Sequence, residues 1–169
     1  MKNFIVGAIA AIGVTFVGTL VYLGLGLAPV GADAKPPAWE GGLMYSTVHA
    51  SVRRRAPKMQ SPLPPTNETV IAGGKLYMDD CGGCHGPPGG PATKYPTTFY
   101  PQVPQFPSVG TQYSEAEVFW VAKHGIRRTG MFPQGSDYTD AELWSLSAFI
   151  TRIKNLSPGV LQGIQRQSK

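Results

Sequence analysis

The stretch Cys81-Gly82-Gly83-Cys84-His85 decides how the rest of the chain is interpreted. Its two cysteines are the only two in the sequence, and a histidine follows the second one directly. The glycines between them let the backbone turn tightly. Prolines and glycines at residues 87–91 end any helix immediately afterwards. The stretch therefore presents two thiols and one imidazole on a single short turn.

This arrangement is typical of a c-type haem attachment site. The two thiols reach the two vinyl groups of a porphyrin, and His85 then places its imidazole under the iron. A thioredoxin-like redox pair would need a βαβ context, which the neighbouring sequence lacks. Half of a zinc site would need two further ligands from scattered histidines, and a short-range disulfide is the third alternative. We expect Cys81 and Cys84 to bind one haem c covalently, with His85 as the proximal iron ligand.

Length and composition fit one small domain with an additional segment. The chain has 169 residues, of which 21 are glycine and 16 proline, so much of it is expected to be loop. A covalently held macrocycle would supply apolar surface that a small domain lacks. The net charge of +5 is spread along the chain apart from three arginines at 53–55, so nucleic-acid binding is not expected.

An apolar run at residues 4–27 predicts a membrane segment. It contains no charged residue, and about 24 helical residues span about 36 Å, enough for a hydrocarbon core. Lys2 before it favours a cytoplasmic N-terminus. A cleaved signal peptide is the alternative, because Ala32-Asp33-Ala34 resembles a cleavage site. We expect an uncleaved single-pass anchor (residues 1–28) in the bacterial inner membrane, and either interpretation places the remainder in the periplasm, where haem is attached.

Residues 29–65 are expected to be a proline-rich periplasmic linker. Prolines near both ends predict stiff, extended backbone. The middle, residues 42–54, lacks proline and contains a short apolar stripe of Leu43, Val48 and Val52 that leads into the three arginines. We expect a solvated linker whose basic cluster is attracted to lipid headgroups; the alternative is a docking helix for a partner subunit.

The first helix of the expected haem domain should cover residues 67–78, with Thr66 as its N-cap. Gly73 and Gly74 remove side-chain bulk from one face, which predicts that another helix crosses there. Beyond the haem motif, residues 91–110 contain too many prolines for helices or strands. We expect them to wrap the haem edge, with Pro91 or Pro96 supplying a carbonyl that orients His85.

Two capping boxes predict two further helices. Ser114 with Glu117 opens one that Gly125 ends, and Thr139 with Glu142 opens another that runs to about residue 154. The second has an apolar stripe along one face, formed by Leu143, Leu146, Phe149, Ile150 and Ile153. The tail at 157–169 shows little pattern, and we expect it to be mobile or bound to a partner.

Met131 lies in the loop between these helices, after Gly130 and shortly before Pro133. A core methionine is more usual on a helix face, so its loop position indicates a ligand. A thioether is a soft, neutral ligand that stabilises ferrous iron. We expect Met131 to be the distal iron ligand. The alternatives are His124 and, less favoured, the three methionines Met78, Met59 and Met44.

Together these motifs resemble the class I monohaem cytochrome c domain. The resemblance covers residues 66–156. It rests on Gly74-x-x-Tyr77 before the haem motif, on Gly125-Ile126 leading to Thr129-Gly130-Met131, and on Leu143-Trp144-x-Leu146-x-Ala148-Phe149-Ile150 within the last helix. It implies an all-α fold in which the first and last helices cross, and His85 and Met131 as axial ligands. The family usually places proline directly after the methionine, whereas here Phe132 intervenes.

The resemblance implies electron transfer rather than catalysis. We expect single electrons to pass between unidentified redox protein partners, with no small-molecule substrate. One alternative is a fixed cytochrome c subunit of a larger respiratory or dehydrogenase complex. Another is a haem-based sensor or peroxidase, which would need an open iron position.

Overall fold

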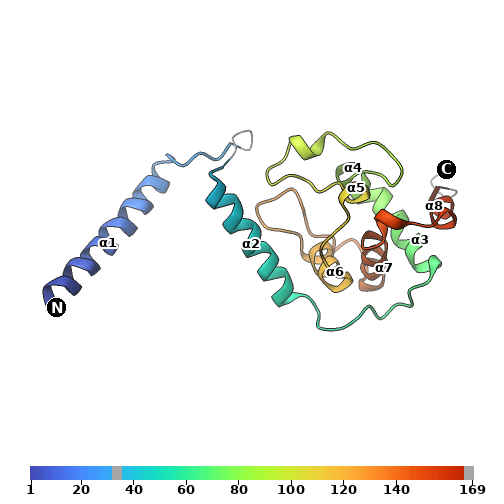
Figure 1. Cartoon of the computed structure of the whole chain (residues 1–169), viewed down its shortest axis with the longest axis horizontal. Coiled ribbons are helices and arrows are strands. Elements are labelled where there is room, and N and C mark those ends of the chain that lie inside the picture. The colour runs from blue at the N-terminus through green and yellow to red at the C-terminus, as the bar shows by residue number, and fades with distance from the viewer. Residues whose placement is uncertain (32–35, 166–169) are drawn as a thin grey trace. The chain divides into compact units, whose positions relative to one another are not determined.

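The computed structural model describes residues 1–31 and 36–165 (Figure 1). Within these residues the regular structure is entirely helical, as predicted. The chain divides into two compact units, Met1–Ala34 and Lys35–Lys169. The candidate cleavage site Ala32-Asp33-Ala34 lies outside the described residues.

The first unit consists of helix α1, Lys2–Gly24. Among the described residues it is the one helix long and apolar enough to cross a membrane, a property that signal sequences share. Its 23 residues span about 34 Å. The hydroxyls of Thr15 and Thr19 each donate to the backbone carbonyl four residues earlier, at 2.9 Å. The polar groups of both side chains are therefore satisfied within the helix, as a hydrocarbon environment requires.

The core of the second unit, the head, is the crossing of α3 (Asn67–Leu76) with α7 (Asp140–Ile150). A Cβ on Gly73 would lie 1.9 Å from the carbonyl oxygen of Ser145, so the two backbones touch at this point. A Cβ on Gly74 would lie 2.5 Å from Ile164. The helix crossing predicted at the two glycines is therefore confirmed, because any larger side chain at Gly73 would separate the helices.

All three predicted helix starts are confirmed. Thr66 caps α3 by accepting a bond from the Thr69 amide. Ser114 and Thr139 open α6 (Glu115–His124) and α7 with complete capping boxes. In each box the backbone amide of the capping residue donates to the carboxylate of the first-turn glutamate, at 2.8 Å in both cases. Local polar chemistry therefore sets where these helices begin.

Helix α7 has more buried residues than any other helix in the described part of the chain. The predicted stripe is buried in full, and Trp144 stacks on Phe119 of α6 with ring centres 4.4 Å apart. The helix ends at Ile150, and a short 3-10 turn, η3 (Ile153–Asn155), replaces the predicted last turn. Ile153 is nevertheless buried, because the turn keeps it directed into the core.

The expectation of an unpatterned tail is wrong for residues 158–165. They form α8, Pro158–Gln165, which packs on α3. Val160 and Ile164 lie four residues apart on one face and are only 3% and 4% exposed. Residues four positions apart lie on the same face of a helix, so Val160 and Ile164 together bury one side of α8 against the head.

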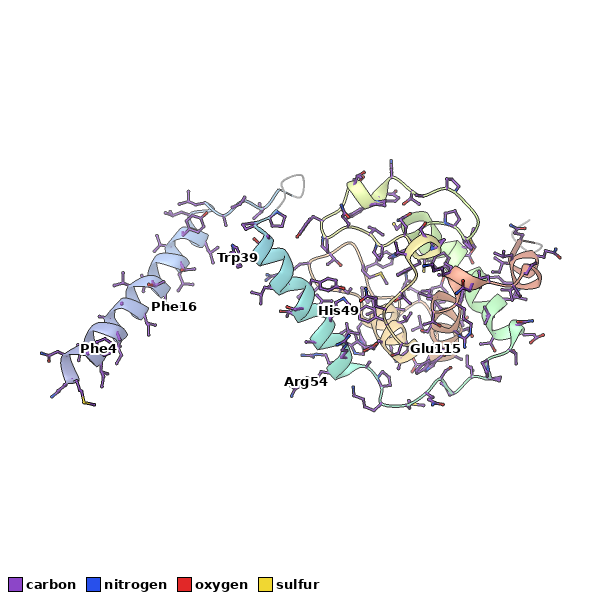
Figure 2. All side chains as sticks on the ribbon, viewed as in Figure 1. Phe4, Phe16, Trp39, His49, Arg54 and Glu115 are labelled. Atoms are coloured by element: carbon purple, nitrogen blue, oxygen red, sulfur yellow. The ribbon has the colours of Figure 1, made fainter. Side chains whose placement is uncertain are left out.

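The expected extended linker is also wrong over residues 38–55. They form helix α2, Ala38–Arg55, which packs against α6. Val52 and Ala56 are 1% and 5% exposed, and His49 lies with its ring centre 4.8 Å from that of Tyr113. Figure 2 shows His49 on the side of α2 that faces α6. The flanking prolines bound this helix without interrupting it. Of the predicted apolar stripe, Val52 is buried and Val48 half-buried, whereas Leu43 is exposed.

Candidate haem site

The Cys-x-x-Cys-His stretch continues directly from α3. A π-helical turn, η1 (Tyr77–Cys81), leads into α4 (Gly82–His85), and Gly86 ends the turn with φ at 89°. The buried hydroxyl of Tyr77 donates to the Gly86 carbonyl at 2.7 Å. Cys81 and Cys84 are both free in this structure and form no disulfide with each other. The motif is thus held at its two ends by one buried tyrosine.

His85 is oriented by a backbone carbonyl. Its Nδ1 lies 2.9 Å from the carbonyl oxygen of Pro104. A carbonyl only accepts hydrogen bonds, so Nδ1 carries the proton and the lone pair of Nε2 is free for a metal. Phe106, at the start of α5 (Phe106–Val109), stacks on the imidazole with ring centres 4.5 Å apart. Burial lowers the pKa of His85, which favours the neutral imidazole that ligates iron.

The orienting residue differs from the prediction. The sequence predicts that a carbonyl of the proline-rich loop orients His85, at Pro91 or Pro96. The carbonyl does come from this loop, but it belongs to Pro104. The same loop also forms two short helices that were not predicted, η2 (Tyr95–Thr97) and α5. Proline is tolerated in the first turn of each helix, because the amides there have no helical partner.

Thr93 and Gln105 form a polar clasp around the motif. The sequence alone does not predict this clasp. The Thr93 hydroxyl and the Gln105 side-chain amide both donate to the carbonyl of Cys84, each at 2.9 Å. The Thr93 amide in turn donates to Gln105 Oε1 at 3.0 Å. A Cβ on Gly86 would lie 3.0 Å from that same oxygen, so the glycine makes room for the clasp. No sequence pattern marks either residue, because they meet only when the loop folds back.

Cys81 lies in an apolar environment. Burial raises its pKa to about 12, and the neighbouring Asp80 and Cys84 contribute further. The site therefore favours an uncharged sulfur. A thioether is uncharged, so covalent attachment to a haem suits this position better than a thiolate–metal bond does.

Met131 lies in a closed turn after α6. Gly125, with φ at 65°, lets the chain reverse; a Cβ there would lie 2.6 Å from the Met131 carbonyl oxygen. That oxygen accepts from the Ile126 amide at 2.8 Å, and the Met131 amide donates to the Thr129 hydroxyl at 3.1 Å. Three local features thus fix the backbone of the expected distal ligand.

The loops of the two expected ligands touch each other. A Cβ on Gly130 would lie 2.9 Å from the ring of Phe99, which belongs to the proline-rich loop that orients His85. Among the alternative ligands, His124 contacts Trp120 on its own helix, at 5.0 Å between ring centres. The other three methionines are exposed at the surface: Met44, Met59 and Met78. The fold therefore brings the Met131 turn and the His85 loop into contact.

The residues present fit a covalently attached haem. Two free thiols, an imidazole with Nε2 available and a methionine sulfur on a fixed turn form a suitable donor set. A zinc site is not supported, since no three His, Cys, Asp or Glu side chains gather within residues 1–31 and 36–165. Cys81, Cys84, His85 and Met131 are the residues that would hold the group.

A comparison with known protein families indicates what kind of domain these residues belong to. The sequence model of the family described as cytochrome C oxidase, cbb3-type, subunit III matches residues 68–150. Searches of curated proteins and of solved structures return no significant match. The matched segment begins in α3 and ends with α7, so it spans the haem motif, the Met131 turn and the crossing helices. Residues 68–150 are a c-type cytochrome domain, an electron-transfer module that binds haem covalently.

Proposed function

We propose that this chain is a membrane-anchored c-type cytochrome with one haem, which passes single electrons between redox partners on the periplasmic side of the bacterial inner membrane. The observation that carries the proposal is the orientation of His85 by Pro104. It leaves Nε2 free beside two free thiols, in a chain that begins with an apolar helix of 23 residues.

Four residues of the chain would hold the cofactor, two by covalent attachment and two by iron ligation. Cys81 and Cys84 would bind it as thioethers, His85 would ligate the iron through Nε2, and Met131 would provide a soft, neutral sulfur on the other side. A haem held in this way supplies reversible one-electron chemistry. With both ligands bound, no iron position would remain open, which favours an electron carrier over a sensor or peroxidase.

The anchor limits how far the head can travel. Thirteen residues separate the end of α1 at Gly24 from the start of α2 at Ala38. Fully extended, they reach at most about 45 Å. Because α2 is folded onto the head, this reach is shorter than a linker of residues 29–65 would allow. The short connection keeps the head concentrated near partners in the same membrane.

Basic residues beside Met131 favour an acidic partner. Arg127 and Arg128 are exposed in the distal turn, and within the part of the chain that the structure describes neither forms an ion pair. Lys123, near the end of α6, instead pairs with Asp140 at 2.6 Å. Steering of a partner to this side therefore rests on the two arginines.

A second candidate is a fixed subunit of a respiratory complex. It is favoured by the matching family, whose description names an oxidase subunit. In that case the same domain would transfer electrons within an assembly rather than between separate partners.

Purification of the full chain with its haem tests these proposals. Intact mass would show whether residues 1–34 are retained and whether one haem is attached. A retained N-terminus with one haem supports the anchored monohaem carrier; a mature chain that starts after Ala34 refutes the anchor. Stable co-purification with other subunits in mild detergent would favour the fixed subunit, whereas a monomer that reduces and oxidises reversibly favours the carrier.

A further inference from the structure

Helix α2 has a second face that the described part of the head leaves uncovered. Residues spaced by three or four positions share one side of a helix, and five such residues form this face, which we call the outer stripe: Trp39, Leu43, Ser46, Ala50 and Arg54. All five are exposed, Trp39 at 70% and Leu43 at 52%. In Figure 2, Trp39 and Arg54 lie on the opposite side of α2 from His49. Large apolar side chains on an ordered, exposed helix indicate a contact surface.

The two ends of the outer stripe differ in chemistry. Apolar side chains occupy its N-terminal end, where Met44 (52% exposed) lies beside Leu43. The C-terminal end contains Arg54, and Arg55 next to it is also exposed. Glu40 is the one acidic residue in the helix. Tryptophan and leucine together with arginine are the composition of helices that lie in the headgroup region of a bilayer.

The connection to α1 supplies an independent argument for this surface. Fourteen residues separate Gly24 from Trp39. Fully extended, a segment of this length reaches at most about 50 Å. If α1 spans the membrane, Trp39 therefore stays within about 50 Å of the lipid surface, so lipid is always within reach of the outer stripe.

We propose that the outer stripe lies in the headgroup region of an anionic bilayer and holds the cytochrome domain against the membrane in one orientation. The opposite face of α2 is fixed to α6 by buried Val52 and by the approach of Arg53 to Glu117 at 3.9 Å. Binding of α2 to lipid therefore orients the whole head. This inference depends on the anchor of the proposed function.

Site-specific labelling of the haem-loaded full chain tests the proposal. The chain is placed singly in lipid nanodiscs of neutral phosphatidylcholine or of a mixture with anionic phosphatidylglycerol. Ala50→Cys reports on the outer stripe, and Gln162→Cys, exposed on α8, is the matched control. The probe is an uncharged polyethylene-glycol maleimide, because the thioethers at Cys81 and Cys84 do not react with it.

We expect Ala50→Cys to be labelled about tenfold more slowly in anionic than in neutral nanodiscs, since two arginines are attracted to the charged surface. Gln162→Cys should be labelled at equal rates in both. Adding Arg54→Glu and Arg55→Glu should restore fast labelling of Ala50→Cys, with an unchanged haem spectrum as evidence of folding. Equal rates for Ala50→Cys in both lipids would overturn the lipid contact and leave a protein partner for this face. Equally slowed labelling of Gln162→Cys in anionic nanodiscs would also overturn the proposal, because the protection would not be specific to the outer stripe.

The failure of the anchor gives a different result. A chain whose α1 is removed does not enter nanodiscs at all, so no labelling rate is obtained from discs. The lipid contact is judged only on chains that have been incorporated.

Discussion

The Nδ1 atom of His85 and the carbonyl oxygen of Pro104 lie 2.9 Å apart, although nineteen positions separate them in the chain. This bond assigns the proton to Nδ1 and so selects Nε2 as the metal-binding atom. Pro104 itself is held by the loop that Gln105 and Thr93 close on the Cys84 carbonyl. The orientation of the proximal ligand thus depends on a polar clasp outside the motif.

Gln105→Leu should weaken this orientation. It removes the bonds to the Cys84 carbonyl and from the Thr93 amide, which should lower the free energy of unfolding by about 1–3 kcal/mol. A looser bond from His85 to Pro104 makes the imidazole a weaker electron donor, so the reduction potential should rise. Redox titration and denaturant unfolding measure the two effects. Thr97→Val is the control, because it removes a hydroxyl bond in the same loop, to Lys94, without touching the clasp. A loss of stability with an unchanged potential would show that the clasp does not orient His85.

Met131→His should lower the reduction potential by on the order of 0.1 V or more, because a second imidazole stabilises ferric iron relative to a thioether. Met131→Ala should abolish the sulfur-to-iron charge-transfer band in the absorption spectrum. Met59→Leu, at an exposed methionine, should leave potential and spectrum unchanged. Persistence of the sulfur band in Met131→Ala would assign the distal position to another methionine.

Gly73→Ala should destabilise the head severely. The new methyl group would lie 1.9 Å from the Ser145 carbonyl oxygen, which belongs to backbone and cannot rotate away. We expect a loss of about 3 kcal/mol or more in the free energy of unfolding, measured by denaturant titration of the haem-loaded protein. Gly42→Ala in α2, where a Cβ meets nothing within 4 Å, should instead stabilise by about 0.5–1 kcal/mol. Equal effects of the two substitutions would contradict close contact at the helix crossing.

Charge reversal at Arg127 and Arg128 should slow electron transfer to an acidic partner. At low ionic strength we expect about a tenfold lower bimolecular rate in stopped-flow measurements, with convergence to wild type at high salt. Lys58→Glu combined with Lys154→Glu, at two exposed lysines outside the distal turn, makes the same change in net charge and is the control. If both variants slow the reaction equally, total charge rather than the position beside Met131 sets the rate.

The capping carboxylate of α7 should make stability depend on pH. Hydrogen bonds from the Thr139 hydroxyl and amide lower the pKa of Glu142 from its ordinary value of 4.5. Because the folded pKa is the lower one, the stabilisation is complete above that ordinary value and disappears as pH falls through the folded pKa. Glu142→Gln should therefore have a lower Tm than wild type at pH 7, and the gap should close in acid. An equal gap in Tm at pH 7 and in acid would show that the capping bond does not depend on the charge of Glu142.

Much of the head could be predicted from residues that act locally. Capping at Thr66, Ser114 and Thr139 depends on side chains that bond within four positions, so the sequence itself contains the signal. The glycine pair at 73–74 likewise predicted a close crossing. The haem motif gave the donor types, and the later match of residues 68–150 to a cytochrome family agrees with it.

What the sequence determined by itself was the local chemistry: where helices start, which stretch is apolar enough for a membrane, and which side chains can bind haem. The tertiary structure alone decided the partners of those elements. Pro104 rather than Pro91 or Pro96 orients His85, because loop closure selects one carbonyl among several that are locally equivalent. Residues 38–55 and 158–165 form docked helices instead of linker and tail. A few apolar residues, here Val52 in one helix and Val160 with Ile164 in the other, stabilise a helix only where a complementary surface buries them.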